Sequence, residues 1–156
     1  MHTDRHHRRA FLGAALAILV GGAAFAADFH FGPRQYYGPW HKHPTHSYFY
    51  RPYFYKPRVN FAGYRHHYVI HFPRRPQYHY FYNPYQRKFW GRCPVKQGDE
   101  PKYSMLTEKD RKAKASDIPE SAFPEPGPLP EIPESTDGGK LDLPPDDLPE
   151  EETPED

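Results

Sequence analysis

The chain has 156 residues, of which 21 are Lys or Arg and 20 are Asp or Glu, so its formal net charge at neutral pH is +1. The charges are segregated: residues 28–98 hold 12 basic and one acidic side chain, whereas residues 99–156 hold six basic and 18 acidic ones. Hydrophobic residues make up only 37% of the chain and 20 residues are proline, which disfavours a large aliphatic core and leaves room for one domain.

Residues 1–26 have the three parts of a secretory signal peptide. A start that contains arginines precedes an apolar run over residues 11–25, and Ala24-Phe-Ala26 fits the cleavage site. The alternative, a membrane-spanning helix, needs about 20 apolar residues, more than this run supplies. Arg8 and Arg9 also resemble a twin-arginine signal, but a Sec-type signal is favoured because paired arginines are common in such starts. We expect export to the periplasm, the cell envelope or the extracellular space, and no transmembrane segment after cleavage.

Residues 27–98 replace aliphatic side chains with aromatic ones. The region contains 12 Tyr, eight Phe and two Trp, but its Val, Ile and Leu residues are only Val59, Val69, Ile70 and Val95. Rings bury much area, yet buried tyrosine hydroxyls need partners, and nine prolines remove amide donors from the backbone. We therefore expect a mostly irregular or disordered chain.

Two patterns in this region favour local β-structure. Residues 68–72 and 78–82 are rich in β-formers and flank a Pro-Arg-Arg-Pro turn, which predicts a small hairpin. The alternative is that these aromatic residues belong to an unfolded, low-complexity chain. An imperfect repeat, Tyr-Phe-Tyr-Arg-Pro at 48–52 and Tyr-Phe-Tyr-Lys-Pro at 53–57, ends each unit in proline and predicts edge strands.

The acidic half of the chain divides into a linker, residues 99–116, and a tail, residues 117–156. A short helix is expected near residues 107–115, because Thr107 can serve as its N-cap and basic residues lie toward its C-terminal end. The tail has 14 acidic residues, one lysine and ten prolines, so it cannot bury enough apolar surface to offset the entropy of ordering. We expect a disordered tail.

Histidines are the candidate metal ligands. A His-x-His pair lies on one side of an extended chain, and imidazole is a favoured ligand of Cu(II) and Zn(II). Nearby carboxylates are lacking and the surrounding positive charge opposes a cation, so the alternative, that the histidines belong to the general aromatic composition, is favoured. No other cofactor is expected. The candidate ligands are His41, His43, His46, His66, His67 and His71.

Cys93 is the one cysteine of the chain. In an exported protein a single cysteine indicates an intermolecular disulfide, and so a disulfide-linked dimer, or a free thiol, which Arg92 would help to ionise. Asp28 is the only acidic residue in residues 28–98, so a catalytic histidine would have no carboxylate there to orient it. We expect a protein that is not an enzyme and has no catalytic residue.

Basic and aromatic residues alternate through the middle region, a pattern that suits anionic surfaces. Basic groups pair with phosphate, sulfate or carboxylate groups while rings stack on bases or sugar faces. Export makes nucleic acid an unexpected partner and favours envelope polysaccharide, lipid head groups or a protein. The alternative partner is the acidic tail of the chain itself. The candidate anion-binding residues are Arg51, Lys56, Arg58, Arg65, Arg74, Arg75, Arg87 and Lys88.

Five short motifs are spread along the chain after residue 80: Phe81-Tyr-Asn-Pro84, Phe89-Trp-Gly-Arg-Cys93, Tyr103-Ser-Met-Leu106, Ile118-Pro-Glu120 and Pro128-Leu-Pro-Glu-Ile-Pro133. With them the chain resembles a set of small exported Tyr/Pro-rich proteins of planctomycete-type bacteria. These proteins have no assigned function, so the resemblance implies an envelope location and no catalytic residue. We expect an exported, non-enzymatic structural or interaction protein of the bacterial envelope that binds anionic surfaces or itself. The alternative is a periplasmic, His-rich metal-sequestering protein.

Overall fold

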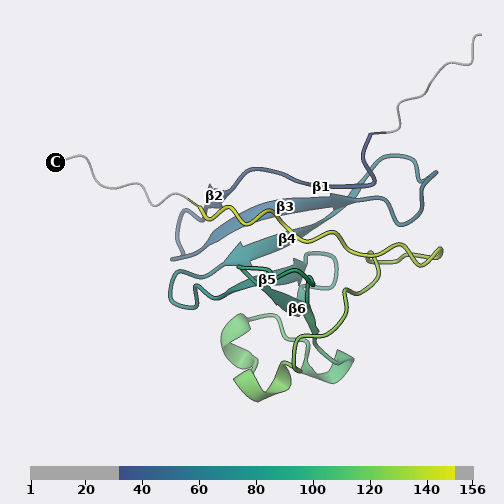
Figure 1. Cartoon of the computed structure of the whole chain (residues 1–156). Helices are drawn as coiled ribbons and strands as arrows, with labels where there is room; N and C mark the ends of the chain where they lie inside the picture. The colour runs from purple at the N-terminus through teal and green to yellow at the C-terminus, as the bar shows by residue number, and fades with distance from the viewer. Residues whose placement is uncertain (1–31, 150–156) are drawn as a thin grey trace, which may run out of the picture. The chain divides into compact units, whose positions relative to one another are not determined.

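The structure, a computed structural model, describes residues 32–149, which form an antiparallel β-sheet (Figure 1). Its order is β1-β3-β4-β5-β6-β7, and β2 pairs with the same strand as β1. The predicted signal peptide, residues 1–26, lies outside the described residues. The strands are β1 (Gln35–Tyr37), β2 (His41–Lys42), β3 (Phe49–Tyr55), β4 (Arg65–His71), β5 (Tyr78–Asn83), β6 (Lys88–Pro94) and β7 (Ser104–Met105).

The expectation of a mostly irregular or disordered chain is wrong. The predicted hairpin is present as β4 and β5, with Tyr68 opposite Tyr82 and Ile70 opposite Tyr80, but it forms the middle of a larger sheet. Buried and half-buried side chains alternate along the whole of β3. Aromatic rings on both faces supply the buried area that the few aliphatic residues do not, and this area stabilises the sheet.

One face of the sheet, here the tail face, is covered by residues 127–147. Ile132 and Leu141 are buried in a cluster with Tyr53, Tyr55 and Val69. Figure 1 shows this segment, in yellow-green, running along the sheet toward β2. The prediction of a disordered tail is therefore wrong for residues 117–149, and residues 150–156 lie outside the described part. Widely spaced apolar residues anchor the tail, although its average composition is polar.

The other face, here the groove face, is covered in part by residues 106–123. This segment forms three 3-10 turns, η1 (Glu108–Asp110), η2 (Ala115–Asp117) and η3 (Glu120–Ala122), drawn in green in Figure 1. Ile118 and Phe123 pack beside Tyr80 and Phe89. No helix within residues 32–149 has the length and apolarity needed to cross a membrane.

The predicted helix near residues 107–115 is wrong, since residues 32–149 contain no α-helix. Thr107 makes no capping hydrogen bond to the backbone; its hydroxyl instead donates to the carboxylate of Asp110 at 2.5 Å. The segment has no apolar stripe with helical spacing, so a helix there would have had no face to bury against the sheet. Short turns allow Leu106 and Ile118 to reach the core instead.

Candidate functional site

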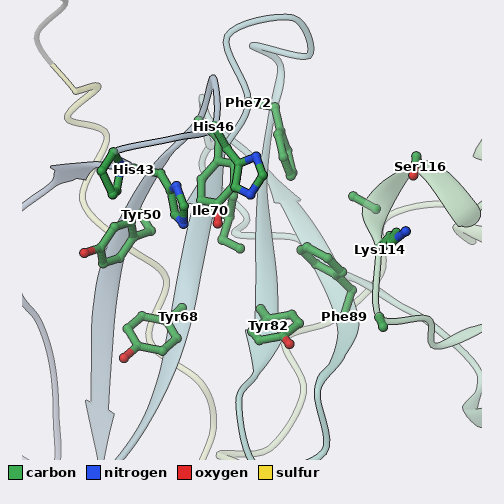
Figure 2. Close-up of a pocket in the computed structure, with 14 residues that line it drawn as sticks. His43, His46, Tyr50, Tyr68, Ile70, Phe72, Tyr82, Phe89, Lys114 and Ser116 are labelled. Carbon is green, nitrogen blue, oxygen red and sulfur yellow. The ribbon is translucent and has the colours of Figure 1, made fainter.

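An open groove of about 860 Å³ crosses the groove face over β3, β4, β5 and β6 (Figure 2). Aromatic and aliphatic side chains of these strands form its floor. The turn between β2 and β3 forms one wall, and residues 113–116 form the other. We call it the tyrosine groove; its lining residues are His43, Pro44, His46, Tyr48, Tyr50, Tyr68, Ile70, Phe72, Tyr82, Phe89, Ala113, Lys114, Ala115 and Ser116.

Strand register places the rings of the floor beside one another. Tyr68 lies opposite Tyr82, which in turn lies opposite Phe89. The ring centroids of Tyr50 and Tyr68 are 5.7 Å apart in an edge-to-face arrangement, and those of Tyr82 and Phe89 are 5.0 Å apart. Each such contact contributes about 0.5–1.5 kcal/mol beyond the buried area. The sheet itself therefore preforms the floor of the groove.

The tyrosine hydroxyls of the groove are free to meet a ligand. Within residues 32–149, those of Tyr48, Tyr50, Tyr68 and Tyr82 have no hydrogen-bond partner. Burial raises the pKa of Tyr48, and the nearby phenols of Tyr50 and Tyr82 raise it further. A phenol that keeps its proton can both donate and accept a hydrogen bond. The groove thus combines ring faces with several donor and acceptor groups.

Backbone hydrogen bonds hold the two walls. The amide of Phe89 donates to the carbonyl of Lys112 at 2.9 Å, and the amide of His43 donates to the carbonyl of Tyr48 at 3.0 Å. The rings of His43 and His46 are in contact, with centroids 4.6 Å apart. Across the groove lie Lys114 and Ser116 (Figure 2). No Asp or Glu is among the described residues that line the groove, so Lys114 gives it a positive charge.

No family model, curated protein or solved structure matches this chain.

The six predicted metal ligands do not converge. His66 and His67 are consecutive on β4 and so lie on opposite faces of the sheet. His41 is on β2, and His43 and His46 belong to the wall of the groove. Among residues 32–149, no group of three or more His, Cys, Asp or Glu side chains is placed to hold a metal ion.

Histidines on the tail face belong to the core. His71 and His79 lie edge to face with ring centroids 5.3 Å apart, and the hydroxyl of Tyr55 is 3.2 Å from Nε2 of His67. Burial lowers the pKa of His67 to about 3 and the pKa of His79 to about 4, and neighbouring positive charges add to both shifts. Both imidazoles are therefore neutral at neutral pH.

Arg51, one of the eight predicted anion-binding residues, holds the tail. Its guanidinium is buried, donates to the carbonyl of Gly38 at 2.8 Å and to the carboxylate of Asp147 at 2.6 Å, and lies 4.9 Å from the centre of the Trp40 ring. The indole of Trp40 donates to the carbonyl of Asp147 at 3.2 Å. This arginine is thus engaged by the chain itself.

Two further predicted residues, Arg65 and Lys56, are also engaged within the fold. Arg65 pairs with Glu134 of the tail at 3.0 Å, and the buried ammonium of Lys56 lies 4.8 Å from the centre of the Tyr64 ring. The remaining five lie in loops and at the start of β6, half-buried at Lys88 and exposed at Arg58, Arg74, Arg75 and Arg87.

Two arginines that were not among the predicted anion-binding residues also fasten the acidic segments. The guanidinium of Arg92 lies between the rings of Tyr78 and Phe123, at 3.8 and 4.0 Å from their centres, and donates to both carboxylate oxygens of Glu120. Arg34 donates to Asp137 at 2.6 Å and holds the pKa of that carboxyl at about 2. In the sequence, only the alternation with aromatic residues pointed to these two arginines as partners of the acidic segments, and the other basic residues of the region share this pattern.

Cys93 lies in the tail-face cluster on β6, opposite His79, and has no exposed surface. Burial raises the pKa of its thiol to about 12, and Asp146 adds to the shift. Arg92, which the sequence suggested would ionise the thiol, instead pairs with Glu120. Adjacent residues of a strand point to opposite faces, so the guanidinium and the thiol are separated by the sheet. A disulfide between two chains would require the tail face to open.

Proposed function

We propose that this chain is an exported, non-enzymatic interaction protein of the bacterial cell envelope that holds its ligand in the tyrosine groove. The groove itself carries the proposal, since it presents aromatic rings and unpartnered hydroxyls on an open surface beside an ammonium group. Concave sites that combine ring faces with a few polar groups are typical of ligand binding. The signal-like residues 1–26 and the resemblance to exported Tyr/Pro-rich proteins support the envelope location.

The chemistry of the groove favours binding over catalysis. A histidine that acts as a general base is usually oriented by a carboxylate, and the described lining of the groove offers none to His43 or His46. The single thiol, which could have served as a nucleophile, is enclosed on the other face of the sheet. The groove walls are held by backbone hydrogen bonds, which suits a preformed binding surface.

Co-sedimentation with isolated cell envelopes tests this function. The mature chain, beginning at Ala27, should sediment with envelopes, and Tyr68→Ala should reduce the bound fraction because it removes a ring from the groove floor. Tyr85→Ala is the matched control, since Tyr85 is 55% exposed and lies outside the groove. Equal binding by both variants would contradict the proposal. When cells instead express the full-length chain, mass spectrometry of the protein recovered from their envelopes should give a chain that starts at Ala27.

A further inference from the structure

The tyrosine groove runs across strands rather than along one, and this direction limits what can bind. Its floor takes residues from four neighbouring strands, β3 to β6, so it spans about 14 Å at the usual spacing of about 4.8 Å between strands. The backbone groups of these strands are already paired with each other in the sheet. On the floor a ligand must therefore be recognised by side chains, and strand addition by a peptide is not available there.

The side chains on the floor suit a chain of rings that carry hydroxyl groups. Tyr50, Tyr68, Tyr82 and Phe89 follow one another across the strands (Figure 2). Their ring faces can stack on the apolar face of a sugar, and the three phenols can donate to and accept from sugar hydroxyls. A sugar hydroxyl both donates and accepts, so it matches this set of groups fully.

Charge narrows the class of ligand. Lys114 supplies an ammonium at one wall, and the described lining includes no carboxylate that would neutralise it or repel an anion. Arg51, Arg65 and Arg92 do not line the groove and are paired with Asp147, Glu134 and Glu120. Lys114 therefore gives the groove a positive charge that an anionic ligand can meet.

We propose that the tyrosine groove binds an acidic polysaccharide, a chain of sugar rings that bear carboxylate groups. The rings of the floor stack on the sugars, the phenols bind their hydroxyls, and Lys114 pairs with a carboxylate. This inference rests on the proposed function, to which it adds the chemical class of the ligand.

After an acidic polysaccharide, a proline-rich peptide is the ligand that fits the chemistry of the tyrosine groove best. Extended proline-rich segments also dock in aromatic grooves, but their prolines present only carbonyl acceptors. Such a ligand would use the phenols as donors and leave the acceptors of the groove, such as the phenol oxygens, without a role. An anionic lipid surface would engage Lys114 but could not stack on rings that lie in a groove.

Calorimetric titration of the mature full chain with oligogalacturonate tests the inference. The wild-type protein should bind this probe and should bind its carboxyl-reduced form more weakly. Tyr68→Ala should weaken both by roughly tenfold, since loss of one stacking ring costs about that much. Lys114→Gln should weaken only the acidic probe and should lower the dependence of its affinity on salt. Tyr85→Ala and Lys96→Gln, which change exposed residues outside the groove, are the controls and should bind as wild type.

Two results would overturn the inference. The first is a Lys114→Gln variant that binds both the acidic and the carboxyl-reduced probe with the affinities of the wild type. This result would show that Lys114 does not pair with a carboxylate of the ligand. The second is Tyr68-dependent binding of a proline-rich peptide or of anionic vesicles, with no binding of either sugar probe. This result would show that the ligand of the groove is not a polysaccharide. In either case Tyr68-dependent sedimentation with envelopes would still support the proposed function, whereas its loss would remove the proposed function as well. Thermal unfolding of each variant shows whether the fold is retained.

Discussion

The carbonyl of Pro52 accepts a 2.9 Å hydrogen bond from the amide of Gly38, in the gap between β1 and β2. The N–H and C=O groups of one strand residue point to the same side, so the amide hydrogen that Pro52 lacks would have faced this gap as well. On its other side β3 pairs with β4 without interruption from Phe49 to Tyr55. A central strand tolerates the proline because the missing donor falls between two short neighbouring strands.

Gly38→Ala should destabilise the protein by about 1–3 kcal/mol, the usual cost of forcing extra volume into a packed site. A β-carbon at this position would lie 2.6 Å from Cγ of Pro52, and the proline ring is fixed in the strand and cannot turn away. Urea unfolding followed by tyrosine and tryptophan fluorescence measures the change. Gly98→Ala is the control, because a β-carbon at Gly98 meets no atom within 4 Å. Equal stability of the two variants would show that Gly38 and Pro52 are not in close contact.

The repeat of residues 48–57 shows how far sequence patterns could lead. Each unit ends in proline, and edge strands were expected, but the first unit supplies most of the central strand β3 and its Pro52 is placed at the one gap that accepts it. That gap depends on where β1 and β2 end, which no local pattern encodes. The two units nonetheless differ in a predictable way. Each unit has five residues, an odd number, and side chains alternate along a strand, so equivalent tyrosines of the two units point to opposite faces of the sheet. Tyr50 lines the groove, whereas Tyr55 lies in the core.

Leu141→Ala should destabilise the protein by about 2–5 kcal/mol, since it removes a fully buried side chain from the cluster with Tyr53 and Val69. Leu148→Ala makes the same chemical change where the side chain is 49% exposed, and it should alter stability by less than about 0.5 kcal/mol. Chemical denaturation of both variants measures the difference. If the two are equally stable, the tail does not contribute to the core.

The tail also shows why composition misled. Averaged over residues 117–156, acidic residues and prolines predict disorder, but folding depends on where the few apolar residues lie. Ile118, Phe123, Ile132 and Leu141 are each buried, and ion pairs with arginines of the basic region, such as that of Arg34 with Asp137, lie between these anchors. The opposite charges of the two halves were visible in the sequence. The pairing of particular residues across about 100 positions was not.

Cys93 in the folded protein should not react with a thiol reagent such as DTNB on the timescale of seconds to minutes. The thiolate is the reactive form, and burial both raises the thiol pKa to about 12 and blocks access to the sulfur. Labelling should become rapid in denaturant, and its rate in water should follow the opening of the sheet. Electrophoresis of the native protein should give the same mobility with and without reductant. Rapid labelling without denaturant, or a dimer sensitive to reductant, would contradict this packing.

Stability should fall as the pH is lowered from about 7 to 5, because two core histidines resist protonation in the folded state. The pKa of His79 is about 4 and that of His67 about 3, both below the ordinary value of 6.5. Below about pH 6.5 the unfolded chain binds protons that the folded chain does not. The stability that the two neutral histidines contribute is therefore present above this pH and is lost as the pH falls toward their pKa values in the folded protein. Urea unfolding at pH 7.5, 6 and 5 measures the slope.

His79→Leu should reduce that slope by up to one proton, which is about 1.4 kcal/mol per pH unit. The imidazole of His79 faces His71, Arg51 and Asp147, so an apolar side chain removes a group whose protonation would add a positive charge beside Arg51. Leu141→Ala is the control, because it lowers stability without changing a titrating group and should shift the curve downward while keeping its slope. A slope that is the same in wild type and His79→Leu would show that His79 is protonated in the folded protein as readily as in the unfolded chain.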